Sequence, residues 1–329
     1  MRSLGKDGPM ASNIGLGCMG MSGMYGPADE AESIATIHAA LDAGVNLLDT
    51  GDYYGMGHNE MLIAKALQGR ARSTALLSVK FGGLRDPKGG WLGIDGRPAS
   101  VKNFLSYSLR RLTTDYIDIY RLGRVDPTVP IEETVGAIAD AIAAGYVRYV
   151  GLSEAGAETL RRAAKVHPIA DVQIEYSIFS RSIESRILPA CRELGIGVTA
   201  YGVLSRGLLS GHWSRDRAVA RSDFRQHAPR FSGSNVENNL GLVEKLRPIA
   251  ARRGVTVAQL AIAWVLLRGN DIVPLVGART RERLKEALGA LQAEFSPDDL
   301  AHIEREVPAG AVAGERYAPA QMANLDSER

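Results

Sequence analysis

Residues 30–50, "EAESIATIHAALDAGVNLLDT", contain the two patterns that decide the fold. In residues 30–43 apolar side chains recur at helical spacing, and Gly44 follows as a helix stop. Residues 45–50, "VNLLDT", are a short apolar run of the kind that forms a buried strand. A helix that leads directly into a buried strand is part of a β/α repeat, so we expect strands and helices to alternate on both sides of it.

The alternation extends over almost the whole chain. Counting "IGLG" as the first, the expected strands are residues 14–17, 45–50, 75–80, 116–122, 147–153, 171–177, 197–202 and 271–277. The expected helices are residues 30–43, about 59–69, about 100–113, 131–144, 156–166, 183–194, near 238–253, 256–268 and 280–290.

Eight strands, each followed by a helix, predict an α/β fold of the (β/α)8 TIM-barrel type, with residues 1–329 forming a single domain. The competing α/β architecture is a doubly wound sheet. The barrel is favoured because no G-x-G-x-x-G that follows a strand also opens a helix, and because no change of composition marks a second domain.

Three long stretches lack a regular pattern: residues 81–99, residues 203–237 and a C-terminal tail after about residue 307. The first two follow strands. Because the loops after the strands of a TIM barrel surround its active site, we expect these long βα loops to form lids and substrate walls. The path of the tail is left open.

Composition excludes several classes of protein. The chain is 45% hydrophobic and 23% charged with a formal net charge of +2, so it has no basic field for nucleic acid. The longest apolar run, "VTVAQLAIAWVLL", is too short to cross a membrane, and the N-terminal residues do not resemble a signal peptide. None of the six histidines closes an expected strand, and the two cysteines lie far apart, so no metal site is expected. We predict a soluble cytoplasmic protein.

Chemistry-bearing side chains follow two neighbouring expected strands. Asp49 and Tyr54 come at and after the end of one, and Lys80 ends the next. Taken singly, Asp49 could be a helix cap and Lys80 a solvated lysine. Together they suggest a general acid, because a lysine beside a phenol lowers the pKa of the tyrosine and an aspartate holds that lysine charged. Such a group suits the reduction of a carbonyl near neutral pH.

Seven separated segments resemble the aldo-keto reductases in sequence and in order, from about residue 10 to 307. They are residues 15–26, 42–60, 78–83, 151–154, 172–177, 200–211 and 273–280. The resemblance implies an NADPH-dependent reductase with an Asp–Tyr–Lys–His tetrad. Tyr54 would be the acid, Lys80 would modulate its pKa, and Asp49 would pair with Lys80.

The fourth tetrad member departs from the family pattern. Where many relatives have Y-x-x-H, this chain has Tyr120, Arg121, Leu122 and Gly123. One hypothesis is a working reductase in which water fills the place of the imidazole, and a second is that Gly123 opens room for a bulky or ring ketone. A third is an NADPH-binding sensor with little turnover, similar to the potassium-channel β-subunits.

We favour the first two hypotheses together, because the loss of one hydrogen-bonding group typically lowers the rate by about 10²–10³ without abolishing it. We interpret Arg121 and Arg124 as solvated or salt-bridged surface arginines, with help to an anionic substrate as the other interpretation.

The resemblance also implies where NADPH binds. Ser153 and Gln173 would hold the nicotinamide carboxamide, and Tyr201 would stack on the ring. The residues over the pyrophosphate would be Gly202, Leu204, Ser205, Arg206, Gly207 and Leu208, and those around the adenosine phosphate and adenine would be Gly277, Arg279, Arg283 and Glu286. Without the resemblance, these segments would be a flexible loop and an exposed basic helix face.

Two positions depart from the family's cofactor pattern, since Glu154 and Ala287 stand where many relatives have Asn. Trp91, Trp213 and Phe231 would form either an apolar substrate wall or the packing of their own loops. His58 is interpreted as a helix-start or surface histidine. The expected partner is a small-molecule carbonyl rather than nucleic acid or a membrane, and a homo-oligomer is left open.

Overall fold

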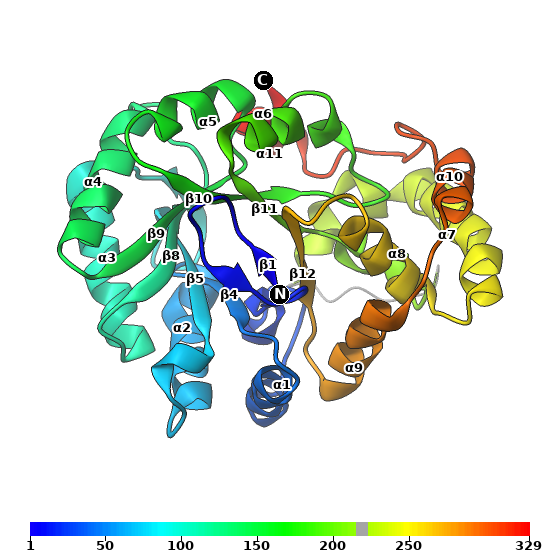
Figure 1. Cartoon of the computed structure of the whole chain (residues 1–329), viewed down its shortest axis with the longest axis horizontal. Helices are drawn as coiled ribbons and strands as arrows, with labels where there is room; N and C mark the ends of the chain where they lie inside the picture. The colour runs from blue at the N-terminus through cyan, green and yellow to red at the C-terminus, as the bar shows by residue number, and fades with distance from the viewer. Residues whose placement is uncertain (215–222) are drawn as a thin grey trace.

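The structure is a computed structural model that describes residues 1–214 and 223–329. Eight parallel strands close into a barrel in the order β10-β11-β12-β3-β4-β5-β8-β9 (Figure 1). These strands are β3 (Gly15–Gly17), β4 (Leu47–Gly51), β5 (Leu76–Phe81), β8 (Ile117–Leu122), β9 (Val147–Ser153), β10 (Ile169–Glu175), β11 (Gly197–Tyr201) and β12 (Ile272–Gly277). Each of them overlaps one of the eight expected strands, so the predicted (β/α)8 barrel is confirmed.

Helices surround the barrel on the outside (Figure 1). The expected ones are α1 (Glu30–Asp42), α2 (His58–Leu67), α3 (Pro98–Leu112), α4 (Ile131–Ala143), α5 (Ala157–Ala164), α6 (Ile187–Leu194), α7 (Gly233–Arg252), α8 (Val257–Leu266) and α9 (Arg281–Gly289). Two further helices, α10 (Pro297–Glu306) and α11 (Pro319–Met322), were not predicted.

The N-terminal residues close the bottom of the barrel. Strands β1 (Arg2–Ser3) and β2 (Met10–Ala11) pair as an antiparallel hairpin. Leu4 and Ala11 in this hairpin are fully buried against Leu47, Ile119 and Val273 from the barrel strands. The hairpin therefore seals the end opposite the one where TIM barrels carry their active sites.

The barrel interior contains a buried ion pair. Arg121 donates to Asp171 at 3.0 Å and to Ser78 at 2.9 Å, and both charged side chains are completely buried. Arg121 points inward because side chains alternate along a strand and Ile119, two residues earlier, also packs inside the barrel. The interpretation of Arg121 as a surface arginine was therefore wrong.

The segments after the strands contain more secondary structure than expected. Residues 81–99 contain an antiparallel pair, β6 (Gly83–Arg85) and β7 (Trp91–Ile94). In the expected loop at residues 203–237, residues 205–210 form a 3-10 turn, and the residues from 233 on belong to α7. Residues 215–222 of this loop lie outside the described residues.

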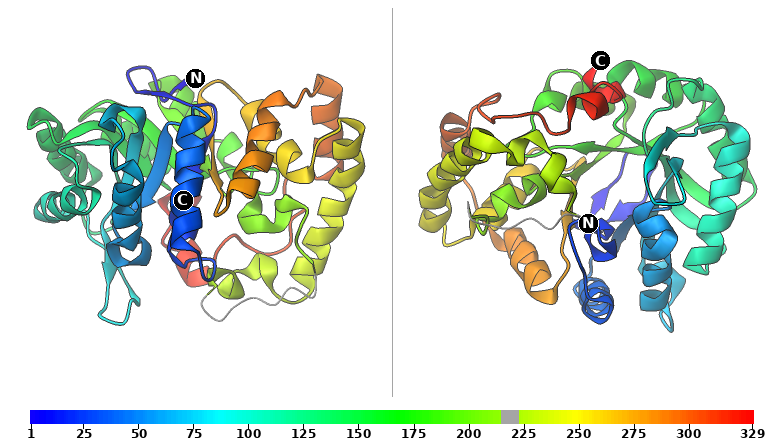
Figure 2. Two further views of the ribbon diagram at one scale, coloured as in Figure 1. Left: turned by 90° about the horizontal axis from the view of Figure 1, so that it is seen from below. Right: turned by 180° about the vertical axis from the view of Figure 1, so that it is seen from behind.

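The C-terminal tail returns to the carboxyl ends of the strands (Figure 2). The Ser327 amide donates to the Glu154 carbonyl at 3.0 Å, just after β9, and the Gly156 amide donates to Asp326 at 2.7 Å. The tail therefore crosses the face where the candidate site residues lie, which settles the path that the sequence left open.

Within the described residues, no single helix is both long and apolar enough to cross a membrane, although α7 and α8, joined by a bend of 84°, meet that test as a pair. The cytoplasmic location stays a prediction.

Candidate active site

Asp49 and Lys80 meet inside the barrel because β4 and β5 are neighbours in parallel register. The Lys80 ammonium donates to Asp49 and, at 2.9 Å, to the side-chain oxygen of Gln173. Gln173 in turn donates to Asp49 at 2.7 Å, and Ser78 does so at 2.9 Å. Asp49 and Lys80 are each only 2% exposed. The predicted Asp49–Lys80 pair is therefore present, and Gln173 belongs to the same cluster.

Burial shifts the pKa values of Lys80 and Tyr54. It lowers the pKa of Lys80 to about 8, although the nearby Asp49 opposes this effect. The Lys80 nitrogen lies 5.2 Å from the centre of the Tyr54 ring. The pKa of Tyr54 is well above its ordinary value, first because the phenol is buried and then because Tyr53 and Asp49 are close.

The net pKa of Tyr54 is therefore raised, where the sequence led us to expect a lowered one, because burial of the phenol is the largest effect. The hydrogen bonds of Lys80 go to Asp49 and Gln173. A phenol with a raised pKa is protonated at neutral pH, and that is the form in which a general acid can donate its proton.

A tight turn sets the position of Tyr54. Residues 54–57 form a 3-10 turn in which Gly55, Met56 and Gly57 have φ angles of 56°, 53° and 91°. The chain is fixed just before this turn, where the Asp52 amide donates to the Lys80 carbonyl at 2.8 Å. The turn thus places Tyr54 beside the end of β5, where Lys80 lies.

Gly123 follows directly after β8, and the space beside it is filled. A Cβ atom at this position would lie 2.9 Å from the hydroxyl oxygen of Tyr53 and 3.1 Å from its Cε1 atom. The structure therefore differs from both favoured hypotheses about Gly123. The place next to it is neither a water site nor open room for a bulky ketone, because the Tyr53 side chain occupies it.

Arg124 faces the ends of the strands. It donates to the Gly123 carbonyl at 2.6 Å, to Tyr317 at 3.1 Å and to Ser153 at 3.4 Å. It is half-buried, so its interpretation as a solvated surface arginine was wrong. Its guanidinium contributes positive charge at the same face of the barrel as Tyr53 and Ser153.

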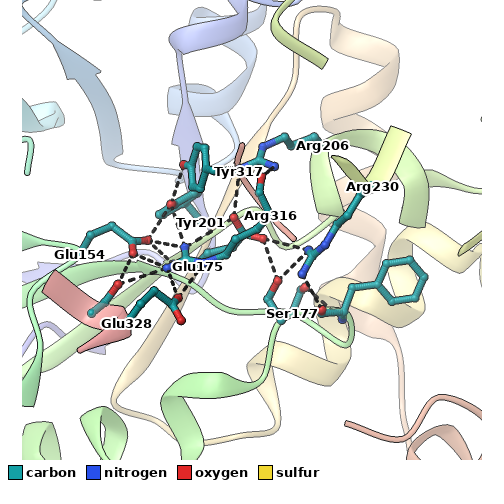
Figure 3. A network of polar contacts seen from close by, with 12 residues as sticks. Glu154, Glu175, Ser177, Tyr201, Arg206, Arg230, Arg316, Tyr317 and Glu328 are labelled. Atoms are coloured by element: carbon teal, nitrogen blue, oxygen red, sulfur yellow. Dashed lines mark hydrogen bonds and ion pairs between the residues drawn. The ribbon is translucent and has the colours of Figure 1, made fainter. Parts of the chain in front are cut away.

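Tyr201, the expected stacking partner of the nicotinamide, closes β11 beside the tail. Its hydroxyl donates to Glu154 at 2.6 Å and lies 2.9 Å from the hydroxyl of Tyr317. Glu154 also accepts two hydrogen bonds from Arg316, at 2.8 and 2.6 Å (Figure 3). Burial alone would raise the pKa of Glu154, but Arg316 lowers it to about 2, so Glu154 is an anion paired within the protein.

A second carboxylate, Glu175 at the end of β10, holds the segment expected over the pyrophosphate. It pairs with Arg206 and with Arg230 at 3.2 Å each, and with Arg316 at 3.7 Å (Figure 3). In this segment four residues have left-handed backbone: Gly202, Ser205, Arg206 and Gly207. The segment therefore includes a 3-10 turn, at residues 205–210, that starts just after these left-handed residues begin. Leu208 is fully buried in the core, and Leu204 packs against it.

The expected adenosine side lies where β12 leads into α9. Gly277 ends β12, and Arg279 donates to the carbonyls of Tyr25 and Pro27 at 3.2 and 3.1 Å. On the first turn of α9, Arg283 pairs with Glu286 at 3.1 Å. At the amino end of α9, the Arg281 amide donates to Glu32 at 2.9 Å and the Arg283 amide to Thr280 at 3.3 Å. A phosphate group here would therefore depend mainly on the guanidinium groups of Arg279 and Arg283.

The remaining predicted residues divide between the site and the loops. Trp91 on β7 lies edge-on to Tyr53, with ring centres 5.7 Å apart, so it flanks the site. Trp213 packs against Phe231 at 4.8 Å, so these two rings pack their own loop. His58 begins α2 and bonds Ser22 at 2.9 Å, which confirms its interpretation as a helix-start residue. No group of three or more His, Cys, Asp or Glu among the described residues is arranged to hold a metal ion.

Sequence reasoning missed Glu175, Arg316 and Tyr317 and gave Tyr53 no role. The doubled tyrosine at 53–54, beside a missing histidine, was a usable signal for Tyr53. No local pattern connects Arg316 with Glu154, because 162 residues separate them.

The sequence and fold of the chain are also similar to those of known proteins. The family model described as "Aldo/keto reductase family" matches residues 13–307. "Probable aldo-keto reductase 1" from Glycine max is 42% identical over 319 residues, which cover 95% of this chain and 90% of that protein. The glycerol dehydrogenase AKR11B4 from Gluconobacter oxydans superposes with a TM-score of 0.83 at 30% identity, covering 94% of this chain and 96% of that one. The holo form of the aldo-keto reductase AKR11C1 from Bacillus halodurans superposes with a TM-score of 0.78 at 29% identity. The match covers 94% of this chain and 96% of that one.

Proposed function

Because the chain belongs to the aldo/keto reductase family, whose members reduce carbonyls with a nicotinamide cofactor, we propose that it is an NADPH-dependent reductase of an aldehyde or ketone. The observation that carries the proposal is the buried cluster of Asp49, Lys80 and Gln173 next to the Tyr54 ring. The reaction would be reversible, with alcohol oxidation as the reverse direction.

The residues present fit a nicotinamide dinucleotide. The guanidinium groups of Arg279 and Arg283, next to the start of α9, suit a phosphate on the adenosine, and this charge favours NADPH over NADH. The left-handed turn at 202–207, with Arg206, suits the pyrophosphate. The bound cofactor supplies the hydride.

The protein's own residues supply the proton and the positioning. Tyr54 would donate its hydroxyl proton to the carbonyl oxygen as negative charge develops there. Lys80 would stabilise the phenolate that remains, because its ammonium lies close to the Tyr54 ring. Asp49 keeps Lys80 in place and protonated. The Tyr54 hydroxyl has no hydrogen-bond partner among the described residues, so it is free to bind a substrate oxygen.

One observation favours a second candidate, a module that binds NADPH with little turnover. Tyr201 and Arg206, both expected cofactor ligands, contact Tyr317 and the Arg316 carbonyl in the tail. A tail that competes for these residues would slow the exchange of cofactor. Measured turnover separates the two candidates, since only a reductase oxidises NADPH when a carbonyl is added.

The test is to mix the purified protein with NADPH and a panel of aldehydes, dicarbonyls and ketones, and to follow the nicotinamide absorbance. Tyr54→Phe is the matched control, because it keeps the ring and removes the proton. Turnover that disappears in Tyr54→Phe supports the reductase. Tight NADPH binding without turnover on any carbonyl supports the binding module. Dissociation constants for NADPH and NADH, compared with those of Arg283→Ala, test the cofactor preference.

A further inference from the structure

We propose that Tyr53 is a second catalytic tyrosine, whose hydroxyl donates the hydrogen bond to the carbonyl oxygen that the missing tetrad histidine would have supplied. The inference rests on the proposed reductase function and adds a residue to it. It starts from the position of Tyr53, whose hydroxyl lies beside Gly123.

Two glycines form a slot for the Tyr53 ring. A Cβ at Gly83 would lie 2.5 Å from the Cδ1 atom of Tyr53, and a Cβ at Gly123 would lie 2.9 Å from its hydroxyl oxygen. Neither glycine has a positive φ angle, so the backbone at both positions would accept any residue. The nearest obstacle to a larger residue at both positions is the Tyr53 side chain, and at Gly83 the Trp91 ring, 3.0 Å from a Cβ atom, is a second one.

Gly123 therefore has a specific structural explanation. An imidazole at residue 123 and a phenol at residue 53 exclude each other, because they enter the same volume. That volume borders the carbonyl oxygen of Phe81, which would lie 3.2 Å from a Cβ atom at Gly123. In this chain, the Tyr53 hydroxyl therefore takes the place of the imidazole as the hydrogen-bonding group at this position.

The hydroxyl of Tyr53 is available to a substrate. It has no hydrogen-bond partner among the described residues. It is also not among their unpaired polar atoms that are fully buried from solvent. The ring lies edge-on to Tyr54, with centres 5.0 Å apart, so the two phenols stand at the same site. A raised pKa, caused first by burial, keeps the Tyr53 hydroxyl protonated as a donor.

The division of labour follows from the neighbours. Tyr54 lies near Lys80, which can stabilise its phenolate, so Tyr54 transfers the proton. Tyr53 lies near Trp91, and although Arg124 lowers its pKa, burial outweighs this effect and keeps the pKa raised. Tyr53 therefore keeps its proton and donates a hydrogen bond as charge develops on the oxygen. A donor of this kind stabilises the transition state more than the ground state.

The first experiment compares Tyr53→Phe with wild type on a carbonyl that wild type reduces. The variant keeps the ring in its slot and loses only the hydroxyl. We expect kcat and kcat/KM to fall together by about 10²-fold, with an unchanged dissociation constant for NADPH. The control is Tyr120→Phe, which removes a buried hydroxyl bonded to the Val101 carbonyl at 3.3 Å, outside the site, and should keep wild-type kinetics. Wild-type kcat/KM in Tyr53→Phe would overturn the inference.

The second experiment tests the slot with Gly123→His, alone and combined with Tyr53→Val. The single variant should unfold at a lower temperature than wild type and lose turnover. The double variant should regain most of the lost thermal stability and part of the turnover. A single variant as stable and active as wild type would show that the two side chains do not compete, and would overturn the inference.

Failure of this inference and failure of the proposed function give different results. If wild type oxidises no NADPH with any carbonyl, the reductase function fails and the role of Tyr53 fails with it. If wild type is active and Tyr54→Phe is inactive while Tyr53→Phe is unaffected, only the role of Tyr53 is wrong.

Discussion

The Lys80 side chain is buried, and because burial shifts its pKa, we expect activity to depend on pH. Burial lowers its pKa to about 8, with Asp49 acting in the opposite direction. Below that pH Lys80 is charged and can stabilise the phenolate of Tyr54, and above it the charge is lost. We expect kcat/KM for carbonyl reduction to fall as the pH rises past about 8, in a profile measured from about pH 6 to 10.

Two variants identify the residue behind that inflection. Lys80→Met should be slower at every pH and should show no inflection near pH 8. Asp52 titrates in the same range, because burial and then Glu60 raise its pKa to about 8. Asp52→Asn should therefore keep the inflection. If the inflection disappears in Asp52→Asn, Asp52 and not Lys80 is the source of the pH dependence.

Asp52 also makes stability depend on pH. Its folded pKa is raised, so the stability due to the protonated carboxyl is complete below the unfolded pKa of about 3.9 and is lost as the pH rises towards 8. Asn at this position does not titrate. The free energy of unfolding of Asp52→Asn should therefore rise relative to wild type by at most about 1.4 kcal/mol per pH unit over that window. Urea unfolding of both proteins at about pH 5 and about pH 7.5 measures the change, and parallel stabilities at the two pH values would contradict it.

Arg316 connects the C-terminal tail to the strand ends. Arg316 donates to Glu154, which is completely buried, and to Glu328 at 2.6 Å. Arg316→Leu would leave the Glu154 carboxylate buried without its cation. We expect a loss of about 3–5 kcal/mol in the free energy of unfolding, measured with urea. The control is Arg305→Leu on the exposed side of α10, and equal losses in the two variants would mean that the Glu154 pair is not the cause.

Most elements with a strong local pattern were predicted, but one helix with such a pattern and one short strand pair were missed. The strands were found because apolar runs and alternation are local, and β9 has the bounds expected for it. Helix α10 was missed although it has a capping box, in which Ser296 and Asp299 bond each other's amides, and this pattern is visible in "SPDDL". The pair β6–β7 was missed because its strands are only three and four residues long.

At the scale of the whole molecule, the site exists only because the barrel closes. Its side chains come from β4, β5, β9, β10 and β11, and from the segments after β4 and β8. Asp49, Tyr54 and Lys80 could be predicted because they lie near each other in sequence or at the ends of neighbouring strands. The contact between Tyr53 and Gly123 could not, because it depends on how β4, β5 and β8 are placed in three dimensions.

The ion pair of Arg121 and Asp171 connects several strands of the barrel. Arg121 on β8 reaches Ser78 on β5 and Asp171 on β10, and Asp171 accepts from Thr199 on β11. The network is incomplete, because the Nε and Nη1 atoms of Arg121 and the Oδ1 atom of Asp171 have no hydrogen-bond partner among the described residues. Its desolvation is therefore only partly offset, and a buried pair of this kind contributes little net stability.

Breaking this pair should nevertheless destabilise the barrel strongly. Asp171→Asn leaves the Arg121 guanidinium buried without its anion, and we expect the free energy of unfolding to fall by about 3–5 kcal/mol. The double variant Arg121→Met/Asp171→Leu removes both charges, so it should be within about 1 kcal/mol of wild type or more stable. Urea unfolding of the three proteins at one pH measures both effects. A double variant as unstable as the single one would mean that these strands need the polar contacts to Ser78 and Thr199, and that the unpaired charge is not the cause.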